Sequence, residues 1–163
     1  ILTGTLMAYQ ARGLEENGVI ATYKHLIANN MEFERKSAHG IIDENTLRDL
    51  YLRVFDKAFS LYKPGCVMTS YNPVNGIYPC ENSALLNDLL RGEWGFDGFV
   101  MTDWGSYDTA DSIRSVCAGT NLLTPGSKKH FRMILKAVKR NEISKAALQH
   151  SVKQIVKVLV RCI

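Results

Sequence analysis

The amino-acid sequence predicts an α/β fold in which about four strand-helix units build a parallel sheet. Short apolar runs alternate with longer amphipathic stretches, a pattern typical of strands that alternate with helices. Polar or ionisable residues follow the end of each apolar run, where a parallel sheet carries its ligand site. The 163 residues are 46% hydrophobic and 22% charged, which is typical of one globular domain with a substantial core.

Four apolar runs are predicted as strands. The first follows Asn17-Gly18, a pair that favours the end of a preceding helix over residues 4–16. The last ends at Thr124-Pro125-Gly126, where proline and glycine indicate a turn. The predicted strands are residues 19–23, 66–70, 99–102 and about 120–123.

The predicted helices follow the spacing of apolar residues. Asp43 is a good N-cap for a helix with one continuous apolar face, and Ser83 can cap a shorter helix. A further helix is expected from Thr109 to Val116, and two helices close the chain. The face that follows Asp43 comprises Leu47, Leu50, Tyr51, Val54, Phe55, Ala58 and Phe59.

Composition argues against several classes of partner. The formal charge of +4 comes from 20 basic and 16 acidic residues spread along the chain, without the long basic run typical of nucleic-acid binding. No apolar stretch reaches about 18 residues, so no membrane span is expected. The sequence does not fix the cellular compartment.

The four cysteines have neither a C-x-x-C pair nor a nearby histidine at ligand spacing. We therefore expect no metal site and mostly buried, reduced thiols: Cys66, Cys80, Cys117 and Cys162.

Asp103 is the first candidate for chemistry. It follows a strand of bulky apolar residues, where a carboxylate must be paired, cap a helix or face a cleft. Its position alone leaves a cap for a helix beginning near Ser106 about as well supported as a functional role. The neighbouring Trp104 favours function, because an exposed aromatic ring beside a carboxylate can stack a sugar against the attacking group.

Lys24 and His25 lie at the end of the first predicted strand. They could recognise hydroxyl or phosphate groups, or they could form a solvated edge with a satisfied histidine, which is the better-supported reading of the pair alone. If both face the same pocket as Asp103, Lys24 would help to keep that carboxylate ionised, as a nucleophile requires.

Tyr71 follows the second strand and begins a turn-rich loop over residues 71–76. Its phenol could donate a hydrogen bond to a carboxylate or to a ring oxygen. Glu81 and Asp97 are weaker candidates for an acid, because each neighbours a predicted helix or turn and is more simply a cap or a surface charge.

Six motifs in order resemble glycoside hydrolase family 3 of the β-glucosidase type, and they extend over nearly the whole chain. The order of all six is far more specific than any one of them. They are Lys24-His25-Leu26 with Asn29-Asn30; Ile42-Asp43-Glu44 with Leu47-Arg48; residues 67–72 with Asn75-Gly76; Leu89-Leu90-Arg91 with residues 94–100; Asp103-Trp104; and Ala118-Gly119-Thr120 with Pro125-Gly126.

The resemblance implies a partial (β/α)8 TIM-type barrel. Residues 1–163 would form the C-terminal half of a catalytic barrel domain, without its first strands and without the domain that follows it. A complete barrel needs about 250 residues. The partner of the chain would therefore be the remainder of the enzyme, and the isolated chain is expected to be inactive or nearly so.

The resemblance also implies a retaining double displacement with Asp103 as the nucleophile. The acid/base carboxylate would come from outside this chain, and neither a metal nor an organic cofactor is implied. Tyr71 would support the nucleophile, Met68 would line the pocket and Trp104 would pack against the sugar. The sugar hydroxyls would be bound by Lys24, His25 and Arg35.

The expected substrate is a terminal β-linked glucoside or a related oligosaccharide. The family branch that hydrolyses N-acetylglucosaminides has a glycine-rich loop with its own histidine after the Lys-His pair, whereas residues 26–30 read Leu-Ile-Ala-Asn-Asn here. Glucosidase or xylosidase activity is therefore favoured, and Trp104 favours glucose. The alternative is a noncatalytic fragment that binds carbohydrate or stabilises a partner.

Overall fold

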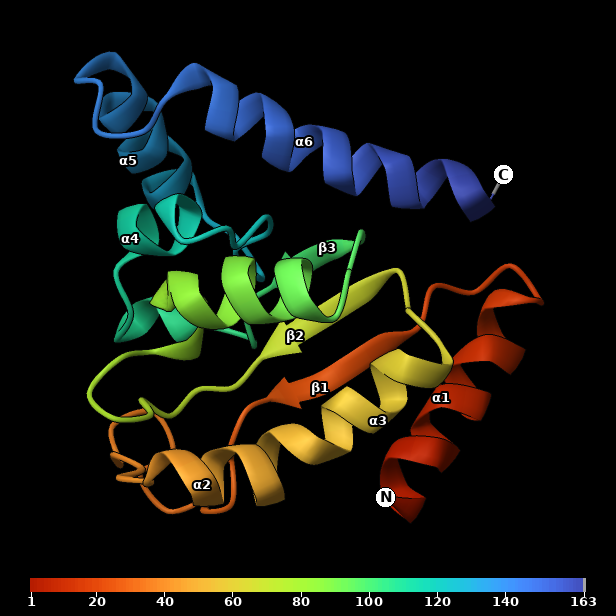
Figure 1. The fold of residues 1–163 in the computed structure, drawn as a ribbon. Helices are drawn as coiled ribbons and strands as arrows, with labels where there is room; N and C mark the ends of the chain where they lie inside the picture. The colour runs from red at the N-terminus through yellow and green to blue at the C-terminus, as the bar shows by residue number, and fades with distance from the viewer. Residues whose placement is uncertain (163) are drawn as a thin grey trace.

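The computed structural model describes residues 1–162, with Cys162 described by its main chain only. Its parallel sheet has the order β1–β2–β3. The three arrowheads in Figure 1 point the same way, and the long loops gather at that end of the sheet. The strands are β1 (Thr22–Leu26), β2 (Cys66–Thr69) and β3 (Phe99–Met101).

Helices connect the strands and close the chain, as the alternating pattern predicts. In Figure 1, α1 and α3 lie beside β1, whereas α6 runs along the β3 side of the sheet. Around the strands the elements follow in this order: α1 (Leu2–Glu15), α2 (Glu44–Thr46), the π-helical η1 (Leu47–Leu52), α3 (Arg53–Leu61), the short η2 (Pro79–Glu81), the π-helical η3 (Ala84–Glu93), the short η4 (Ser106–Asp108), α4 (Ser112–Cys117), α5 (Lys128–Lys139), α6 (Lys145–Leu159) and the short η5 (Val160–Cys162).

The first strand begins three residues later than predicted. Val19 donates its main-chain N–H to the carbonyl of Leu14, and the N–H of Ala21 donates to the carboxylate of Glu15. These bonds tie the start of the predicted strand to the end of α1, so that β1 begins only at Thr22. The strand also continues to Leu26, so Lys24 and His25 lie within it and not after it.

The predicted fourth strand is reduced to a single parallel bridge between Leu122 and Met101. Asn121 explains the difference. Its side-chain oxygen accepts the N–H of Val100 at 2.7 Å, where a continuing strand would offer a main-chain carbonyl. The strand predicted over about residues 120–123 is therefore present only as this bridge at Leu122.

Of three predicted helix starts, one has the expected capping residue and two begin differently in the structure. Asp43 accepts the N–H of Thr46 and caps α2 as expected. Before η3, however, the carboxamide of Asn82 accepts the N–H of Leu85, and Ser83 makes no cap bond. The helix predicted from Thr109 begins later, because the carboxylate of Asp111 caps α4.

The π-helical turns of η1 also break the predicted continuous apolar face. Leu52 and Phe55 are buried, but Leu50 is 60% exposed. A π-helical segment places more residues in each turn than an α-helix does, so the 3.6-residue spacing used for the prediction does not hold across it. Leu50 therefore leaves the buried face.

Side chains alternate between the two faces of the sheet along each strand, and each face contacts a hydrophobic cluster. Val67 and Val100 face a large core with Phe59 of α3 and Leu86 of η3. Phe59 also contacts three aromatic rings, at centroid distances of 5.2 to 5.7 Å. On the opposite face a smaller cluster joins the starts of β2 and β3 to α6, through Cys66, Phe99, Met101, Ile155 and Val158.

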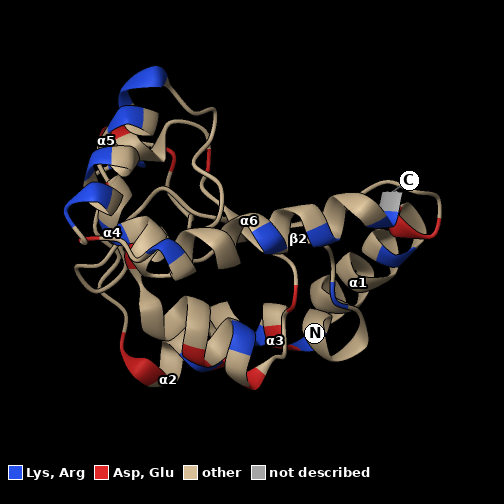
Figure 2. Ribbon diagram, turned by 90° about the horizontal axis from the view of Figure 1, so that it is seen from above, with Lys and Arg blue, Asp and Glu red and all other residues tan. Residues whose placement is uncertain are grey.

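Charge is less evenly spread than the sequence suggested. Figure 2 shows Lys and Arg gathered along α5, a helix that contains neither Asp nor Glu. The basic residues of α5 include Lys128 and Lys129 at its start. Within the described residues, no helix has the length and hydropathy needed to cross a membrane.

Candidate active site

Asp103 lies two residues beyond the end of β3, at the carboxyl edge of the sheet, with only 13% of its side chain exposed. Its Oδ1 accepts the N–H of Trp104 at 2.6 Å. The following turn, η4, has Gly105 at its cap position and no side-chain cap bond. The alternative role of Asp103 as a helix cap is therefore not what the structure shows.

His25 faces the other oxygen of this carboxylate. Its Nε2 lies 3.3 Å from Oδ2 of Asp103, and its side chain is 29% exposed. Burial lowers the pKa of His25 below its ordinary value, while the charge of Asp103 opposes that change. The imidazole is therefore mainly neutral at pH 7, with one nitrogen able to donate and the other able to accept a hydrogen bond.

Lys24 is exposed on the same strand. Within residues 1–162 it makes no ion pair with Asp103, since no nitrogen–oxygen distance between them is 4.0 Å or less. Its positive charge is one of the influences that lower the pKa of His25. Support of the Asp103 charge by direct contact with Lys24 is thus not present in this structure.

Tyr71 joins β2 to the turn that carries Asp103. The ring is 4% exposed, and the phenol donates to the main-chain carbonyl of Trp104 at 2.6 Å. Burial and then the nearby charge of Asp103 raise the pKa of Tyr71. The guanidinium of Arg35 lies 4.6 Å from the centroid of the same ring and pairs with Glu32 at 2.8 Å.

Trp104 and Met68 are the remaining residues of the predicted sugar-binding site. The Trp104 side chain is 59% exposed beside Asp103, as a stacking surface for a ligand would need to be. Met68 pairs in register with Met101, two residues before Asp103, so the two methionines share a face of the sheet. The site therefore draws on all three strands or the loops directly after them.

The sequence prediction missed Lys36. Its Nζ donates to Asp108 at 2.8 Å and to the carbonyl of Gly105 at 3.2 Å, just beyond the predicted nucleophile. No local pattern marks Lys36, because it stands in a polar loop beside Arg35. Only the fold brings it to partners 69 and 72 residues away.

The two weaker acid candidates have structural partners. Glu81 accepts the main-chain N–H of Asp111 and lies 3.8 Å from Arg114. Asp97 pairs with Lys157 of α6, and the hydrogen bond from this lysine is the main cause that lowers the pKa of Asp97. Both groups therefore support the fold in this structure.

The described residues show no group of three or more His, Cys, Asp or Glu side chains placed to hold a metal ion. Burial raises the pKa of Cys66 to about 12 and that of Cys80 to about 11, so both are buried free thiols. Cys117 is free but exposed, contrary to the expectation of burial. The side chain of Cys162 lies outside the described part of the chain.

A cavity of about 470 Å³ contains none of the predicted site residues. It lies between the α2–α3 segment and η3 and is lined largely by charged side chains. Arg48 of this lining is already paired with Glu44 at 2.5 Å. This cavity is therefore separate from the carboxyl edge of the sheet, where Asp103, His25 and Tyr71 lie together.

Comparisons with known proteins identify the family to which this chain is similar. The family model described as "Glycosyl hydrolase family 3 N terminal domain" matches residues 1–158. "Probable beta-glucosidase I" of Aspergillus oryzae is 38% identical over 162 residues, 98% of this chain and 19% of that protein. "Probable beta-glucosidase J" of Aspergillus fumigatus is also 38% identical over 162 residues, 98% of this chain and 18% of its own length.

Solved structures of β-glucosidases contain a region with the same fold as this chain. β-Glucosidase 3B from Thermotoga neapolitana in complex with glucose superposes with a TM-score of 0.91 at 37% identity, over 97% of this chain and 23% of that one. The GH3 β-glucosidase of Bifidobacterium adolescentis has a TM-score of 0.87 at 33% identity, over 93% of this chain and 22% of its own. The chain thus spans about a fifth of the length of these relatives, and its fold is that of part of their barrel domain.

Proposed function

The chain belongs to glycosyl hydrolase family 3, and from this premise we propose that it supplies the nucleophile side of a retaining β-glucosidase site. Asp103 attacks the anomeric carbon of a terminal β-linked glucoside from its position after β3. The observation that carries the proposal is the largely buried carboxylate with Oδ1 bonded to Trp104 N and Oδ2 facing His25.

The proposed reaction has two balanced displacements. In the first, a carboxylate oxygen of Asp103 forms a bond to the anomeric carbon as the glycosidic bond breaks, and the leaving oxygen takes a proton from an acid outside this chain. In the second, water attacks the same carbon, the ester bond to Asp103 breaks, and the proton of the water passes to the group that acted as the acid. The anomeric configuration is retained.

The surrounding side chains would bind and orient the sugar. Lys24, His25 and Arg35 have the donors and the acceptor needed for its hydroxyls, and the exposed ring of Trp104 offers a stacking surface. Tyr71 holds the carbonyl of Trp104 and thereby the turn that carries the nucleophile. Met68 would line the pocket from β2. The proposed partner is the remainder of the barrel together with the part of the enzyme that carries the acid.

The test uses the polypeptide expressed from the full coding sequence that contains this chain, with an activated aryl β-glucoside as substrate. Asp103→Ala is expected to lower kcat by a factor on the order of a thousand or more, because it removes the attacking group. Unchanged turnover in this variant would overturn the assignment of Asp103.

The alternative function, carbohydrate binding without turnover, is favoured by one observation. Glu81 and Asp97, the other carboxylates considered as acids, are engaged with Asp111 and Lys157. If the full polypeptide binds glucose, as measured by calorimetry, but cleaves neither aryl glucosides nor cellobiose, this alternative replaces the enzymatic proposal.

A further inference from the structure

Lys36 joins two loops that follow different strands. It lies in the segment between β1 and α2, and its Nζ donates to Oδ2 of Asp108 at 2.8 Å and to the carbonyl of Gly105 at 3.2 Å. Asp108 and Gly105 belong to the turn that follows β3 and Asp103. One ammonium group therefore makes two hydrogen bonds across the carboxyl edge of the sheet.

The loop after β2 also meets this lysine. The phenol of Tyr78 donates to the main-chain carbonyl of Lys36 at 3.2 Å. The Nζ of Lys36 lies 5.5 Å from the centroid of the Tyr71 ring, which also has Arg35 over it at 4.6 Å. Lys36 is thus the point at which all three loops after the strands are held together.

The turn that carries Asp103 is fixed at successive main-chain groups. The carbonyl of Trp104 accepts from Tyr71 at 2.6 Å, and the N–H of Gly105 donates to the carbonyl of Thr124 at 2.9 Å. The carbonyl of Gly105 then accepts from Lys36. Removal of the Lys36 ammonium would leave the Gly105 carbonyl without its hydrogen bond from the loop that follows β1.

Gly105 is the residue that permits this close approach. Its φ of +78° is in the left-handed region, and a Cβ there would lie 3.3 Å from Asp108 Oδ2 and 3.4 Å from Lys36 Nζ. A side chain at position 105 would therefore be strained by its backbone and would crowd both charged groups of the bridge.

We propose that Lys36 is a positioning residue for the reaction proposed above, on which this inference rests. Lys36 acts through its neighbours: it holds the loop of the sugar-binding Arg35 against the turn that carries Asp103 and Trp104. The ion pair is partly exposed, 36% for Lys36 and 60% for Asp108, so it adds little to overall stability. Its effect is on the relative placement of the binding and attacking groups.

A matched control is present in the chain. The pair between Lys157 and Asp97 also joins distant segments, 60 residues apart, and its side chains are 43% and 57% exposed. It ties α6 to the segment before β3, so it lies at the opposite edge of the sheet from Asp103. Lys157→Met therefore removes a comparable ion pair without touching the proposed site.

The experiment measures aryl β-glucoside kinetics in the full polypeptide for Lys36→Met, Lys36→Arg and Lys157→Met. Lys36→Met is expected to lower kcat/KM by about threefold to tenfold, mainly through a higher KM, because Arg35 loses its fixed position. Lys36→Arg should restore most of this loss, and Lys157→Met should leave KM unchanged. Salt at about 0.5 M should narrow the gap between wild type and Lys36→Met, because it screens exposed charges.

Hydrogen exchange of the main chain provides a readout that does not depend on turnover. Peptides covering residues 103–109 should exchange faster in Lys36→Met than in wild type, with no such change in Lys157→Met. If the wild type binds and folds but cleaves no glucoside, the enzymatic proposal fails and the positioning proposal, which rests on it, fails too, whatever the exchange shows. If the wild type is active, the positioning proposal is overturned when Lys36→Met matches Lys157→Met in KM or in exchange.

Discussion

At the scale of single residues, the pair of His25 and Asp103 places a titratable ring beside the carboxylate proposed as the nucleophile. The imidazole is 3.3 Å from a carboxylate, yet burial is the stronger influence and lowers the pKa of His25. At neutral pH the pair therefore consists of a neutral ring beside the carboxylate. A neutral ring retains an acceptor nitrogen, which a protonated ring lacks.

The lowered pKa of His25 predicts how stability changes with pH. In the unfolded chain His25 has its ordinary pKa of about 6.5, so on acidification the unfolded state takes up the proton first. The contribution of His25 is fully present above about pH 6.5, decreases as the pH falls and is lost below the folded pKa. Thermal melting between pH 5 and 8 should show a steeper acid loss of Tm in wild type than in His25→Gln; parallel curves would contradict the prediction.

The sequence was sufficient to find the residues that follow strands, because strand ends in a parallel sheet lie at one edge. Asp103 and Tyr71 were identified in this way, and the structure brings them together. Lys36 could not be found by the same reasoning. Its role depends on contacts with Gly105 and Asp108, which no local spacing specifies.

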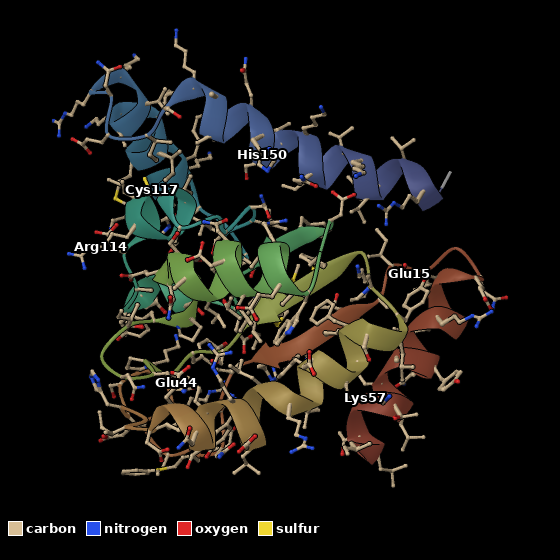
Figure 3. The ribbon with its side chains drawn as sticks, viewed as in Figure 1. Glu15, Glu44, Lys57, Arg114, Cys117 and His150 are labelled. Atoms are coloured by element: carbon tan, nitrogen blue, oxygen red, sulfur yellow. The ribbon has the colours of Figure 1, made fainter. Side chains whose placement is uncertain are left out.

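At the scale of the elements, Glu15 ties the end of α1 to the starts of two strands. Its Oε1 accepts from Gly65 N at 2.6 Å and from Ala21 N at 3.1 Å, while Oε2 accepts from the phenol of Tyr62 at 3.0 Å. Figure 3 shows Glu15 between α1 and the start of β2. One carboxylate thus satisfies three donors at the amino edge of the sheet.

Glu15→Ala is therefore expected to lower the free energy of unfolding by about 2 to 4 kcal/mol, since it leaves partly buried N–H groups without an acceptor. Glu16→Ala is the matched control, because Glu16 is exposed and, among the described residues, its one ion pair is with Arg12 one turn away. The control should change stability by less than about 0.5 kcal/mol. Equal urea midpoints for the two variants would show that Glu15 does not have this role.

Whether the bounds of an element could be predicted from the sequence depends on which interaction sets them. Helices with regular 3.6-residue spacing were predicted well, but η1 was not, since its π-helical turns change the spacing. The start of β1 depends on Glu15, and the length of the fourth strand depends on Asn121. Both are side-chain bonds to main-chain groups across the fold, so they leave no periodic signal.

At the scale of the whole molecule, the sheet has an open edge at β1. The neighbouring α1 presents an exposed apolar stripe: Leu2 is 71%, Leu6 60% and Tyr9 61% exposed. The spacing of these residues puts them on one side of the helix, opposite the buried Ala8 and Ala11. Edge strands and exposed apolar stripes favour association.

Residues 1–163 expressed alone are therefore predicted to self-associate. Light scattering should report species larger than the monomer, and Leu6→Lys should shift the distribution toward the monomer because it places a charge in the stripe. Ser60→Lys, at an exposed position of α3, controls for the added charge. A monodisperse monomer with a sharp melting transition would argue against this prediction.

The central claim is that Asp103 forms a covalent bond to the sugar, and trapping that bond tests it most directly. The full polypeptide would be treated with a 2-deoxy-2-fluoro-β-glucoside that has an activated leaving group, which slows the second displacement more than the first. We predict a mass gain of one fluoroglucosyl group, located by peptide mapping on Asp103 and absent in Asp103→Ala. A label on another carboxylate, or turnover that proceeds without any label while Asp103→Ala remains active, would contradict the account.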